Sequence, residues 1–426
     1  MARFRSGYSG FTDLDYKPAG KDLVCSFYVK PSKGISVRGA AERIAGESSV
    51  GTWTEVGTMN KGIHEKAARV FEIKGNWVKV AYPGVLFEPG NMPQIMSSIA
   101  GNIFGMKDVE KLRLHDVKWP KHIIKSFKGP RFGVQGIRKL LKVPKRPLVG
   151  TIIKPKLGLS HREHAKVAYE AWAGGCDIVK DDENLSNQVF NRFNDRVRLT
   201  IRMRDKAEKE TGERKVYMPN VTAETNEMLK RARFVKAQGG RYIMVDILTC
   251  GWSGLQTLRD ADLGMVMHAH RAGHAAFTRG MHGISMLVVA DIARLIGVDQ
   301  LHVGTVVGKM EGGKEEVMDI VEEMEKDFIP EKPGRHKLSE RWHSVKPVFA
   351  VCSGGLHPGH VPPLVRMLGK DIIIQMGGGI HGHPDGTRAG ATAARQAVDA
   401  VLRGQKLKAY AKRHSELAKA IRTWGI

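Results

Sequence analysis

The stretch Asp177-Ile178-Val179-Lys180-Asp181-Asp182-Glu183-Asn184 decides the fold, because a short apolar run ends there in a lysine beside three carboxylates. It is the second of eight such runs, and helical stretches separate them over the last two thirds of the chain. The predicted strands are residues 150–156, 177–182, 216–221, 242–248, 265–270, 300–305, 348–353 and 372–376. Eight strand–helix units over about 255 residues fit a closed parallel barrel better than an open sheet. The carboxyl ends of all eight strands would then share one face, where residues distant in sequence form one pocket.

The chain of 426 residues is predicted to be an α/β protein in three parts. Residues 1–129 mix strand-like and helical patterns, which indicates an α+β, ferredoxin-like N-terminal domain. Residues 130–388 form the (β/α)8 TIM barrel that carries the chemistry, and residues 389–426 form a helical extension. The N-terminal strand patterns cover 22–30, 69–82 and 111–119, and one barrel helix is expected at 283–296.

The composition limits the class of protein. No apolar stretch reaches the ~20 residues of a membrane span and the first residues lack a signal-peptide core, so we expect a cytoplasmic protein without a membrane partner. The formal net charge of +24 could serve nucleic-acid binding, but acids lie among the bases. A solvated basic surface that attracts small anions is favoured, and no nucleic-acid partner is predicted. The four cysteines form no C-x-x-C pair, so free buried thiols are expected rather than disulfides or a zinc site.

Lys180 is the most informative residue of the second strand. Strand alternation directs Lys180 and Asp182 to the inside of the barrel, and Glu183 can join them if the loop turns back. The two carboxylates suit Mg²⁺. An ammonium would repel the metal, so Lys180 must be salt-bridged, neutral or chemically modified. A neutral amine, which burial favours, can add CO₂ to become an anionic carbamate. The alternative is an ordinary Lys–Asp ion pair at a strand end.

Cationic strand ends indicate an anionic substrate. Lys154 and Lys156 share the inward register of the first predicted strand. The fifth strand ends in His270, which could serve acid–base chemistry, followed by Arg271, which could bind a phosphate. After the sixth strand, Lys309 lies between glycines, as in a mobile lid.

Glycine clusters follow the seventh and eighth strands, at 354–355 and 377–379. Their bare backbone N–H groups can bind a phosphate, and the loops after these two strands are the usual phosphate site of a barrel. With Arg271 on the other side, two anion sites would flank the metal. That arrangement suits a small bisphosphate.

These residues lie in motifs that closely resemble the large subunit of ribulose-1,5-bisphosphate carboxylase/oxygenase (Rubisco). The resemblance runs essentially end to end, and the compact C-terminus is most similar to the archaeal form III enzymes, with features of form II/III. The motifs that carry it are GTIIKPKLG, GGCDIVKDDEN, HAHRAGH, LHVGTVVGKMEGG, SGGLHPGH and QMGGGIHGHP.

The resemblance implies a role for each motif residue. Lys180 would be the carbamylated lysine that also removes the C3 proton, with Asp182 and Glu183 completing the ligands of one Mg²⁺ per site. Lys154 would deliver the final proton to C2. Of the other catalytic residues, His270 would transfer protons during hydration and cleavage, and Lys309 would stabilise the new carboxylate. The implied substrate-binding residues are Glu47, Thr52, Trp53, Asn102, Lys156, Arg271, His302, Ser353, Gly355, Gln375, Gly377 and Gly378.

The resemblance also implies the reaction and the assembly. The expected activity is carboxylation of ribulose 1,5-bisphosphate with CO₂ and water to two 3-phosphoglycerates, with a competing oxygenase reaction, in archaeal AMP catabolism. The segment from Glu47 to Trp53 would enter the active site of a neighbouring subunit, so a homodimer or a ring of homodimers without a small subunit is expected. The alternative is a Rubisco-like enolase or isomerase that acts on a related sugar phosphate.

Overall fold

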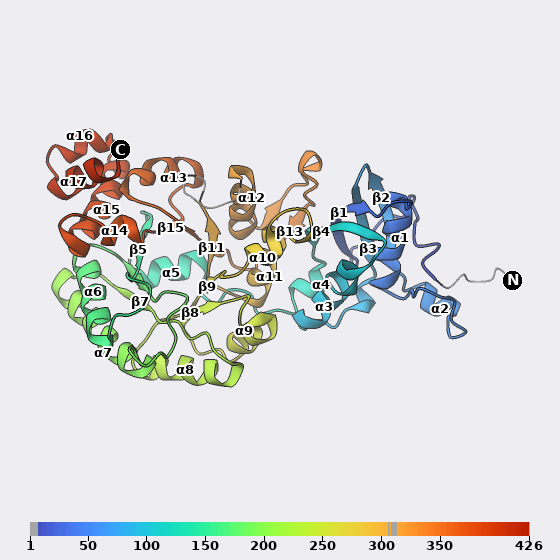
Figure 1. The fold of residues 1–426 in the computed structure, drawn as a ribbon, viewed down its shortest axis with the longest axis horizontal. Helices are drawn as coiled ribbons and strands as arrows, with labels where there is room; N and C mark the ends of the chain where they lie inside the picture. The colour runs from blue at the N-terminus through green and yellow to red at the C-terminus, as the bar shows by residue number, and fades with distance from the viewer. Residues whose placement is uncertain (1–6, 306, 308–312, 426) are drawn as a thin grey trace. The chain divides into compact units, whose positions relative to one another are not determined.

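The computed structural model describes residues 7–305, 307 and 313–425. They form two compact units, and Figure 1 draws both from the blue N-terminus to the red C-terminus. The N-terminal unit comprises Met1–Lys128, Gly273–Ile296 and Lys326–Val345. The barrel unit comprises Gly129–Ala272, Gly297–Glu325 and Lys346–Ile426. Among the described residues, no helix has the length and apolar character needed to cross a lipid bilayer.

A five-stranded sheet organises the N-terminal unit. Its strands are β1 (Leu23–Pro31), β2 (Arg69–Lys74), β3 (Trp77–Tyr82), β4 (Val109–Lys118) and β10 (Gly283–Ile284). The helices are α1 (Val37–Glu47), α2 (Lys61–His64), α3 (Met92–Ile99), α4 (Lys121–Ile124), α10 (Ala275–Thr278) and α11 (Met286–Ile296). The strand order is β10-β4-β1-β3-β2, and β1 lies antiparallel to both β3 and β4. A separate hairpin pairs β12 (Phe328–Ile329) with β13 (Glu340–Arg341).

Two predicted elements differ from the structure at glycines. The expected strand at 69–82 is a hairpin, because the chain reverses at Gly75, whose φ of +57° is easily adopted only by glycine. The expected helix at 283–296 begins instead at Met286, and Gly283 pairs with β4. Gly283 has a φ of +127°, and a Cβ there would lie 2.1 Å from the carbonyl oxygen of Phe277.

The barrel unit contains the predicted eight parallel strands. They are β5 (Leu148–Ile152), β6 (Ile178–Lys180), β7 (Val216–Met218), β8 (Tyr242–Asp246), β9 (Val266–His270), β11 (Gln300–Gly304), β14 (Phe349–Ser353) and β15 (Ile372–Gln375). The strand order is β7-β6-β5-β15-β14-β11-β9-β8, and a parallel bridge between Asn220 and Met244 joins the two edge strands. The sheet is therefore nearly closed, and the predicted TIM barrel is confirmed.

Helices surround this sheet, and several of them follow along the outside of the barrel unit in Figure 1. They are α5 (Gly133–Leu141), α6 (His161–Ala173), α7 (Phe193–Thr211), α8 (Thr225–Ala237), α9 (Gly251–Asp260), α12 (Lys314–Glu325), α13 (Val361–Leu368), α14 (Gly378–His381), α15 (Gly386–Leu402), α16 (Leu407–Ala411) and α17 (Ser415–Trp424). Ser160 begins α6 with a capping box, in which its hydroxyl and the Glu163 carboxylate satisfy backbone N–H groups.

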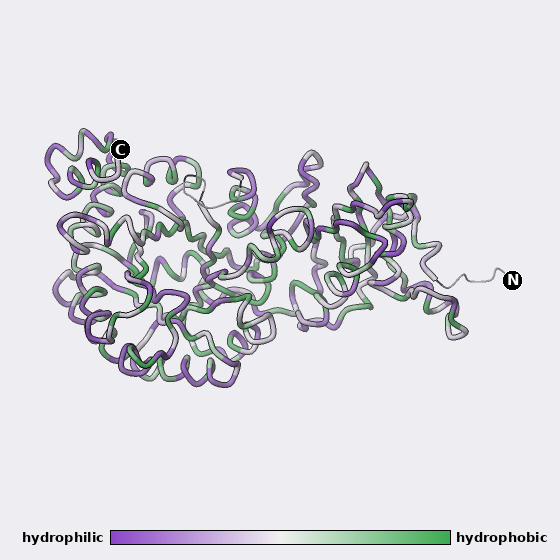
Figure 2. The backbone as a smooth tube through the Cα atoms, in the orientation of Figure 1, coloured by the Kyte–Doolittle hydropathy of each residue, from purple (hydrophilic) through white to green (hydrophobic). Residues whose placement is uncertain are grey.

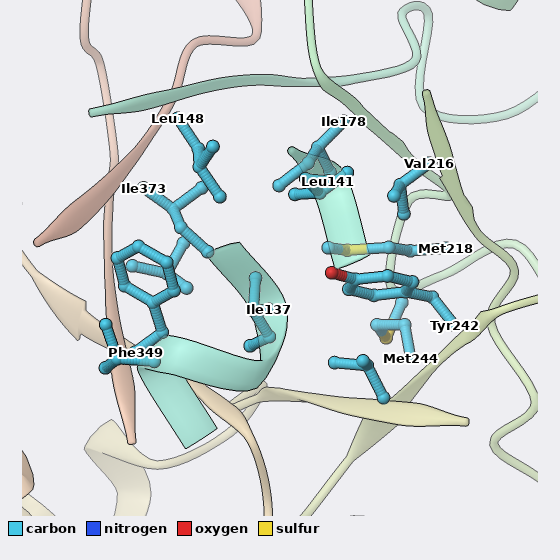
Figure 3. Close-up of a cluster of buried hydrophobic side chains, with 13 residues drawn as sticks. Ile137, Leu141, Leu148, Ile178, Val216, Met218, Tyr242, Met244, Phe349 and Ile373 are labelled. Carbon is cyan, nitrogen blue, oxygen red and sulfur yellow. The ribbon is translucent and has the colours of Figure 1, made fainter. Parts of the chain in front are cut away.

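The amino-terminal half of the barrel interior is an apolar core. Side chains from the starts of the strands, such as Ile178, Tyr242 and Phe349, pack against Ile137 and Leu141 of α5 (Figure 3). All five are at most 1% exposed. In Figure 2 the green of hydrophobic residues likewise follows the barrel strands. Burying each large apolar side chain contributes roughly 1.5–3 kcal/mol, so this core stabilises the scaffold that holds the strand ends.

Several predicted strands extend past the observed strand ends, and two of them, 150–156 and 177–182, affect the site. β5 ends at Ile152, so Lys154 and Lys156 lie on the following loop rather than on the inward register of a strand. Pro155 lacks the N–H that would continue the hydrogen-bond ladder. β6 ends at Lys180, so Asp182 also lies on a loop. The positions of these side chains therefore follow from the loops and not from strand alternation.

Candidate active site

The carboxyl-terminal half of the barrel interior is polar and almost closed to solvent. Lys180 is 0% exposed, and Asp246, His302 and Gln375 are at most 3% exposed. They come from four different strands, β6, β8, β11 and β15. The strand ends thus gather titratable and hydrogen-bonding side chains on one face, as the barrel predicts.

Lys180 lies at the centre of this face. Its Nζ donates a hydrogen bond to the carbonyl oxygen of Asp181 (2.7 Å) and lies 3.6 Å from Oε2 of Glu183. Burial lowers the pKa of the Lys180 amine, although the charges of Glu183, Asp246 and Asp182 act in the opposite direction. A lowered pKa increases the fraction of the neutral amine, which is the nucleophilic form.

The two predicted metal-binding carboxylates are each paired with a lysine of the β5 loop. Nζ of Lys154 lies 2.8 Å from Oδ2 of Asp182, and Nζ of Lys156 lies 3.4 Å from Oε1 of Glu183. Burial alone would raise the pKa of Glu183, but the charges of Lys180 and His270 lower it to about 2. The Glu183 carboxylate therefore carries the negative charge that a hard cation requires.

Asp181, the third acid of the motif, belongs to the scaffold. Its carboxylate accepts hydrogen bonds from the guanidinium of Arg196 (3.1 Å), the hydroxyl of Tyr217 (2.7 Å) and the backbone N–H of Asn220 (3.0 Å). It is completely buried, so its lone pairs are committed to these partners. The motif therefore divides into one structural carboxylate and two that face the site.

His270 contacts Glu183 and is oriented by an acid that the sequence reasoning missed. Nδ1 of His270 lies 2.6 Å from Oδ1 of Asp246, and its Nε2 lies 3.7 Å from Oε2 of Glu183. A carboxylate on Nδ1 holds that proton and directs Nε2 into the site. The signal for Asp246 in the sequence is its position as the last residue of β8.

A chain of hydrogen bonds crosses the site beside His270. Oγ of Ser353 lies 2.6 Å from Nδ1 of His302, Nε2 of His302 lies 2.8 Å from Nε2 of His268, and Nδ1 of His268 lies 2.8 Å from Oε1 of Gln300. Burial lowers the pKa of His268 and of His302 well below 6.5, so both rings are neutral. Because an amide oxygen only accepts, each proton in the chain points toward Gln300. No pattern in the sequence indicates the role of Gln300.

Arg271 and the glycines lie at strand ends that can bind anions. Burial lowers the pKa of Arg271 to about 10, although the charge of Glu316 acts in the opposite direction. A Cβ added to Gly377 would meet only Cε of Lys154, at 3.2 Å, and one added to Gly378 would meet no atom within 4 Å. Gly355 has a φ of +69°, which favours glycine in its turn.

Gln375 of β15 pairs in register with Ser353 of the neighbouring strand β14. Neither polar atom of its buried amide has a hydrogen-bond partner among the residues that the structure describes. Buried polar groups are usually satisfied, so these atoms are free to bind a ligand.

The remaining predicted residues lie in the N-terminal unit or outside the described residues. Glu47 accepts a hydrogen bond from the Tyr8 hydroxyl and lies 3.4 Å from Nδ2 of Asn102. Thr52 is partly exposed, and the side chain of Trp53 lies open to solvent at 80% exposure. Lys309 lies outside the residues that the structure describes.

The site has two carboxylates but needs a further ligand to bind a metal. No group of three or more His, Cys, Asp or Glu side chains within the described residues could hold an ion. Asp182 and Glu183 fit Mg²⁺, which prefers oxygen ligands and retains open positions. Lys180 is the adjacent group that modification could convert into a third oxygen ligand.

Comparisons with known proteins agree with this geometry. The family model for the ribulose bisphosphate carboxylase large chain, catalytic domain, matches residues 133–424, and that for its N-terminal domain matches residues 10–123. The ribulose bisphosphate carboxylase of Methanocaldococcus jannaschii is 51% identical over 97% of this chain and 99% of its own length. That of Pyrococcus horikoshii is 49% identical over 98% of this chain and 96% of its own.

Solved structures show the same similarity. The octameric Rubisco of Pyrococcus horikoshii, crystallised with a sulfate ion, has a TM-score of 0.92 and 48% identity, covering 99% of this chain and 97% of its own. The dimeric archaeal Rubisco of Hyperthermus butylicus has a TM-score of 0.93 and 46% identity, covering 98% of this chain and 99% of its own.

Proposed function

The chain belongs to the ribulose bisphosphate carboxylase (Rubisco) large-chain family, in its archaeal type, and on that premise we propose a Mg²⁺-dependent mechanism for its carboxylase activity. The substrate is ribulose 1,5-bisphosphate, and the products are two molecules of 3-phosphoglycerate. The observation that carries the mechanism is the fully buried Lys180 amine beside Glu183.

Activation begins at Nζ of Lys180. The lone pair of the neutral amine attacks the carbon of CO₂, an electron pair moves to one oxygen, and the nitrogen loses a proton. The resulting carbamate, Asp182 and Glu183 would hold one Mg²⁺, which would polarise the sugar oxygens. The lowered pKa of Lys180 supports this step because only the unprotonated amine can add CO₂.

The bisphosphate lies across the site with a phosphate at each side. The buried guanidinium of Arg271 holds one end together with the face formed by His302 and Ser353. Backbone N–H groups of Gly355, Gly377 and Gly378 hold the other phosphate, and Gln375 offers its free amide to the sugar.

Proton transfers follow from the side chains around the sugar. A carbamate on Lys180 would remove the C3 proton to give an enediol, which adds CO₂ at C2. After cleavage Lys154, located between Asp182 and Gly377, would return the final proton to C2. His270, oriented by Asp246, serves hydration and cleavage. Lys156 is a further cation beside Glu183, and Lys309 is proposed to stabilise the new carboxylate. Molecular oxygen competes for the same enediol, which gives the oxygenase reaction.

The proposed assembly is a homodimer or a ring of homodimers, without a small subunit. It is supported by the dimeric and octameric states of the similar archaeal structures. Glu47, Thr52, Trp53 and Asn102 would complete the site of the neighbouring subunit. We also propose that the reaction serves to convert the ribose of AMP to phosphoglycerate, as the resemblance to the archaeal form III enzymes implies.

A radiolabelled carboxylation assay tests this function. The protein is preincubated with bicarbonate and Mg²⁺, or with neither, and then given the bisphosphate and ¹⁴CO₂. We expect two phosphoglycerates per bisphosphate, with label, and slower onset without preincubation. Exchange of the C3 proton without label in the product would contradict carboxylation and indicate a Rubisco-like enolase instead.

A further inference from the structure

The turn after the last barrel strand, residues 377–382, has both open and tightly packed positions; we name it the glycine turn. Gly377 and Gly378 have space beside them, as described for the phosphate position. At two other positions the packing is close: a Cβ on Gly379 would lie 2.2 Å from the carbonyl oxygen of Leu356, and one on Gly382 would lie 3.1 Å from Cη2 of Trp424. The turn is thus supported by parts of the chain that are far away in sequence.

Two supports come from the barrel itself. The imidazole of His381 connects Oγ1 of Thr151 on β5 (2.9 Å) with Oγ1 of Thr387 on α15 (3.0 Å). The backbone at Leu356, in the loop after β14, packs directly against Gly379. These contacts join the glycine turn to the neighbouring strands.

The third support comes from α17 in the C-terminal extension. The indole of Trp424 stacks on the imidazole of His357, with ring centroids 5.8 Å apart and planes inclined by 12°. A Cβ added to Gly382 would meet the same indole, so one side chain lies beside both the β14 loop and the glycine turn. Its Nε1 is buried and has no hydrogen-bond partner within the described residues, so the ring is held by packing alone.

The helix that carries Trp424 is firmly attached to the barrel unit. The backbone carbonyl of Glu416 lies 3.0 Å from Nε2 of His383, and its carboxylate accepts a hydrogen bond from Nε2 of Gln396 (2.8 Å). The backbone N–H of Leu417 donates to Oε1 of Gln396 (3.0 Å). Movement of the indole relative to the turn is therefore restricted.

We infer that Trp424 is a positioning residue that holds the glycine turn in the geometry for binding the substrate phosphate. The inference rests on the proposed function, because the phosphate at Gly377 and Gly378 is part of it. Backbone N–H groups bind an anion well only when the backbone is already in the bound conformation. Without the Trp424 indole, the glycine turn would have to become ordered when the substrate phosphate binds. Substrate binding is then weaker, while the proton-transfer groups are unchanged.

The test compares Trp424→Ala with Trp424→Phe in the full-length protein. We expect Trp424→Ala to raise the KM for ribulose 1,5-bisphosphate roughly ten-fold while kcat changes less than about two-fold, because small displacements at a binding site have effects of this order. Trp424→Phe retains a flat ring and should restore most of the affinity. Trp424→Leu, which keeps apolar bulk without the stacking face, replaces the alanine variant if that one does not fold.

Controls separate this role from a structural one. Arg422→Ala changes an exposed residue of the same helix and should leave KM unaltered. Calorimetric titration with ribulose 1,5-bisphosphate, without CO₂, measures affinity independently of turnover. Equal affinity in wild type and Trp424→Ala would overturn the inference, as would a loss of kcat that merely follows a fall in Tm. If wild type neither binds the bisphosphate nor incorporates label, the proposed function fails instead.

Discussion

The two halves of the barrel interior are built on the same strands but have opposite chemistry. On β6, Ile178 lies in the apolar core, and two residues later Lys180 lies in the site. On β14, Phe349 and Ser353 show the same change over four residues. Adjacent layers of one strand thus serve stability and chemistry separately. The apolar half must therefore offset the free-energy cost of burying a lysine and several histidines.

The largest effect is expected from Lys180→Met, which makes the polar carboxyl-terminal half of the barrel interior more like the apolar amino-terminal half. Carboxylation should fall by at least about a thousand-fold and lose its dependence on bicarbonate, since the nucleophilic amine is gone. The free energy of unfolding should stay the same or rise, because an apolar chain of similar length replaces a buried amine. Labelled product formation and denaturant unfolding measure both quantities. Retained bicarbonate activation would refute the role of Lys180.

Phe349→Ala makes the complementary change in the apolar core. Removing this completely buried ring should lower the free energy of unfolding by about 3–5 kcal/mol through lost burial and a cavity. At a temperature well below the new Tm, kcat should be nearly unchanged because the strand ends are untouched. A large loss of kcat in the folded variant would show that the two halves are not separable.

Asp246→Asn tests how the His270 ring is oriented in the polar half of the barrel interior. The amide keeps the size of the side chain but no longer fixes the proton on Nδ1 of His270, so carboxylation should fall roughly 10–100-fold. The matched control is Asp260→Asn, which alters an acid on α9 and should leave activity intact. Equal activity of the two variants would contradict the proposed role of Asp246.

The smallest effect is a pH dependence confined to the polar layer. His268 and His302 have folded-state pKa values well below 6.5, caused by burial and by neighbouring positive charges. Near pH 6.5 these two histidines bind protons in the unfolded chain but stay neutral in the folded chain. The free energy of unfolding should therefore fall as the pH drops below that value. Denaturant unfolding at pH 7.5 and pH 5.5 measures the change. A His268→Gln variant should show a weaker dependence.

The strand ends were predictable because parallel strands buried on both sides read as short apolar runs, and a barrel brings their carboxyl ends together. That argument located Lys180, His270 and Ser353 correctly. It was wrong about Lys154 and Asp182, which it assigned to strand registers although both lie on loops. Periodicity cannot tell where a ladder stops.

Other features could not be derived from local patterns. The reversal at Gly75 and the short β10 depend on single glycines within otherwise continuous patterns. Gln300 and Trp424 act through partners distant in sequence, so no local signal distinguishes them from ordinary core residues. Tertiary contacts decide such roles.

The bridge at Asn220 has a consequence for heat resistance. The backbone at Asn220 bridges from the end of β7 to β8. In addition, its side-chain amide donates to the carbonyl oxygens of Glu183 (3.0 Å) and Leu185 (3.1 Å). The residue at which the barrel closes therefore also anchors the loop that carries Glu183, a proposed magnesium ligand. Heating that breaks the bridge between β7 and β8 would displace this loop and abolish activity while the rest of the barrel is still folded. Loss of activity should therefore occur at a lower temperature than unfolding.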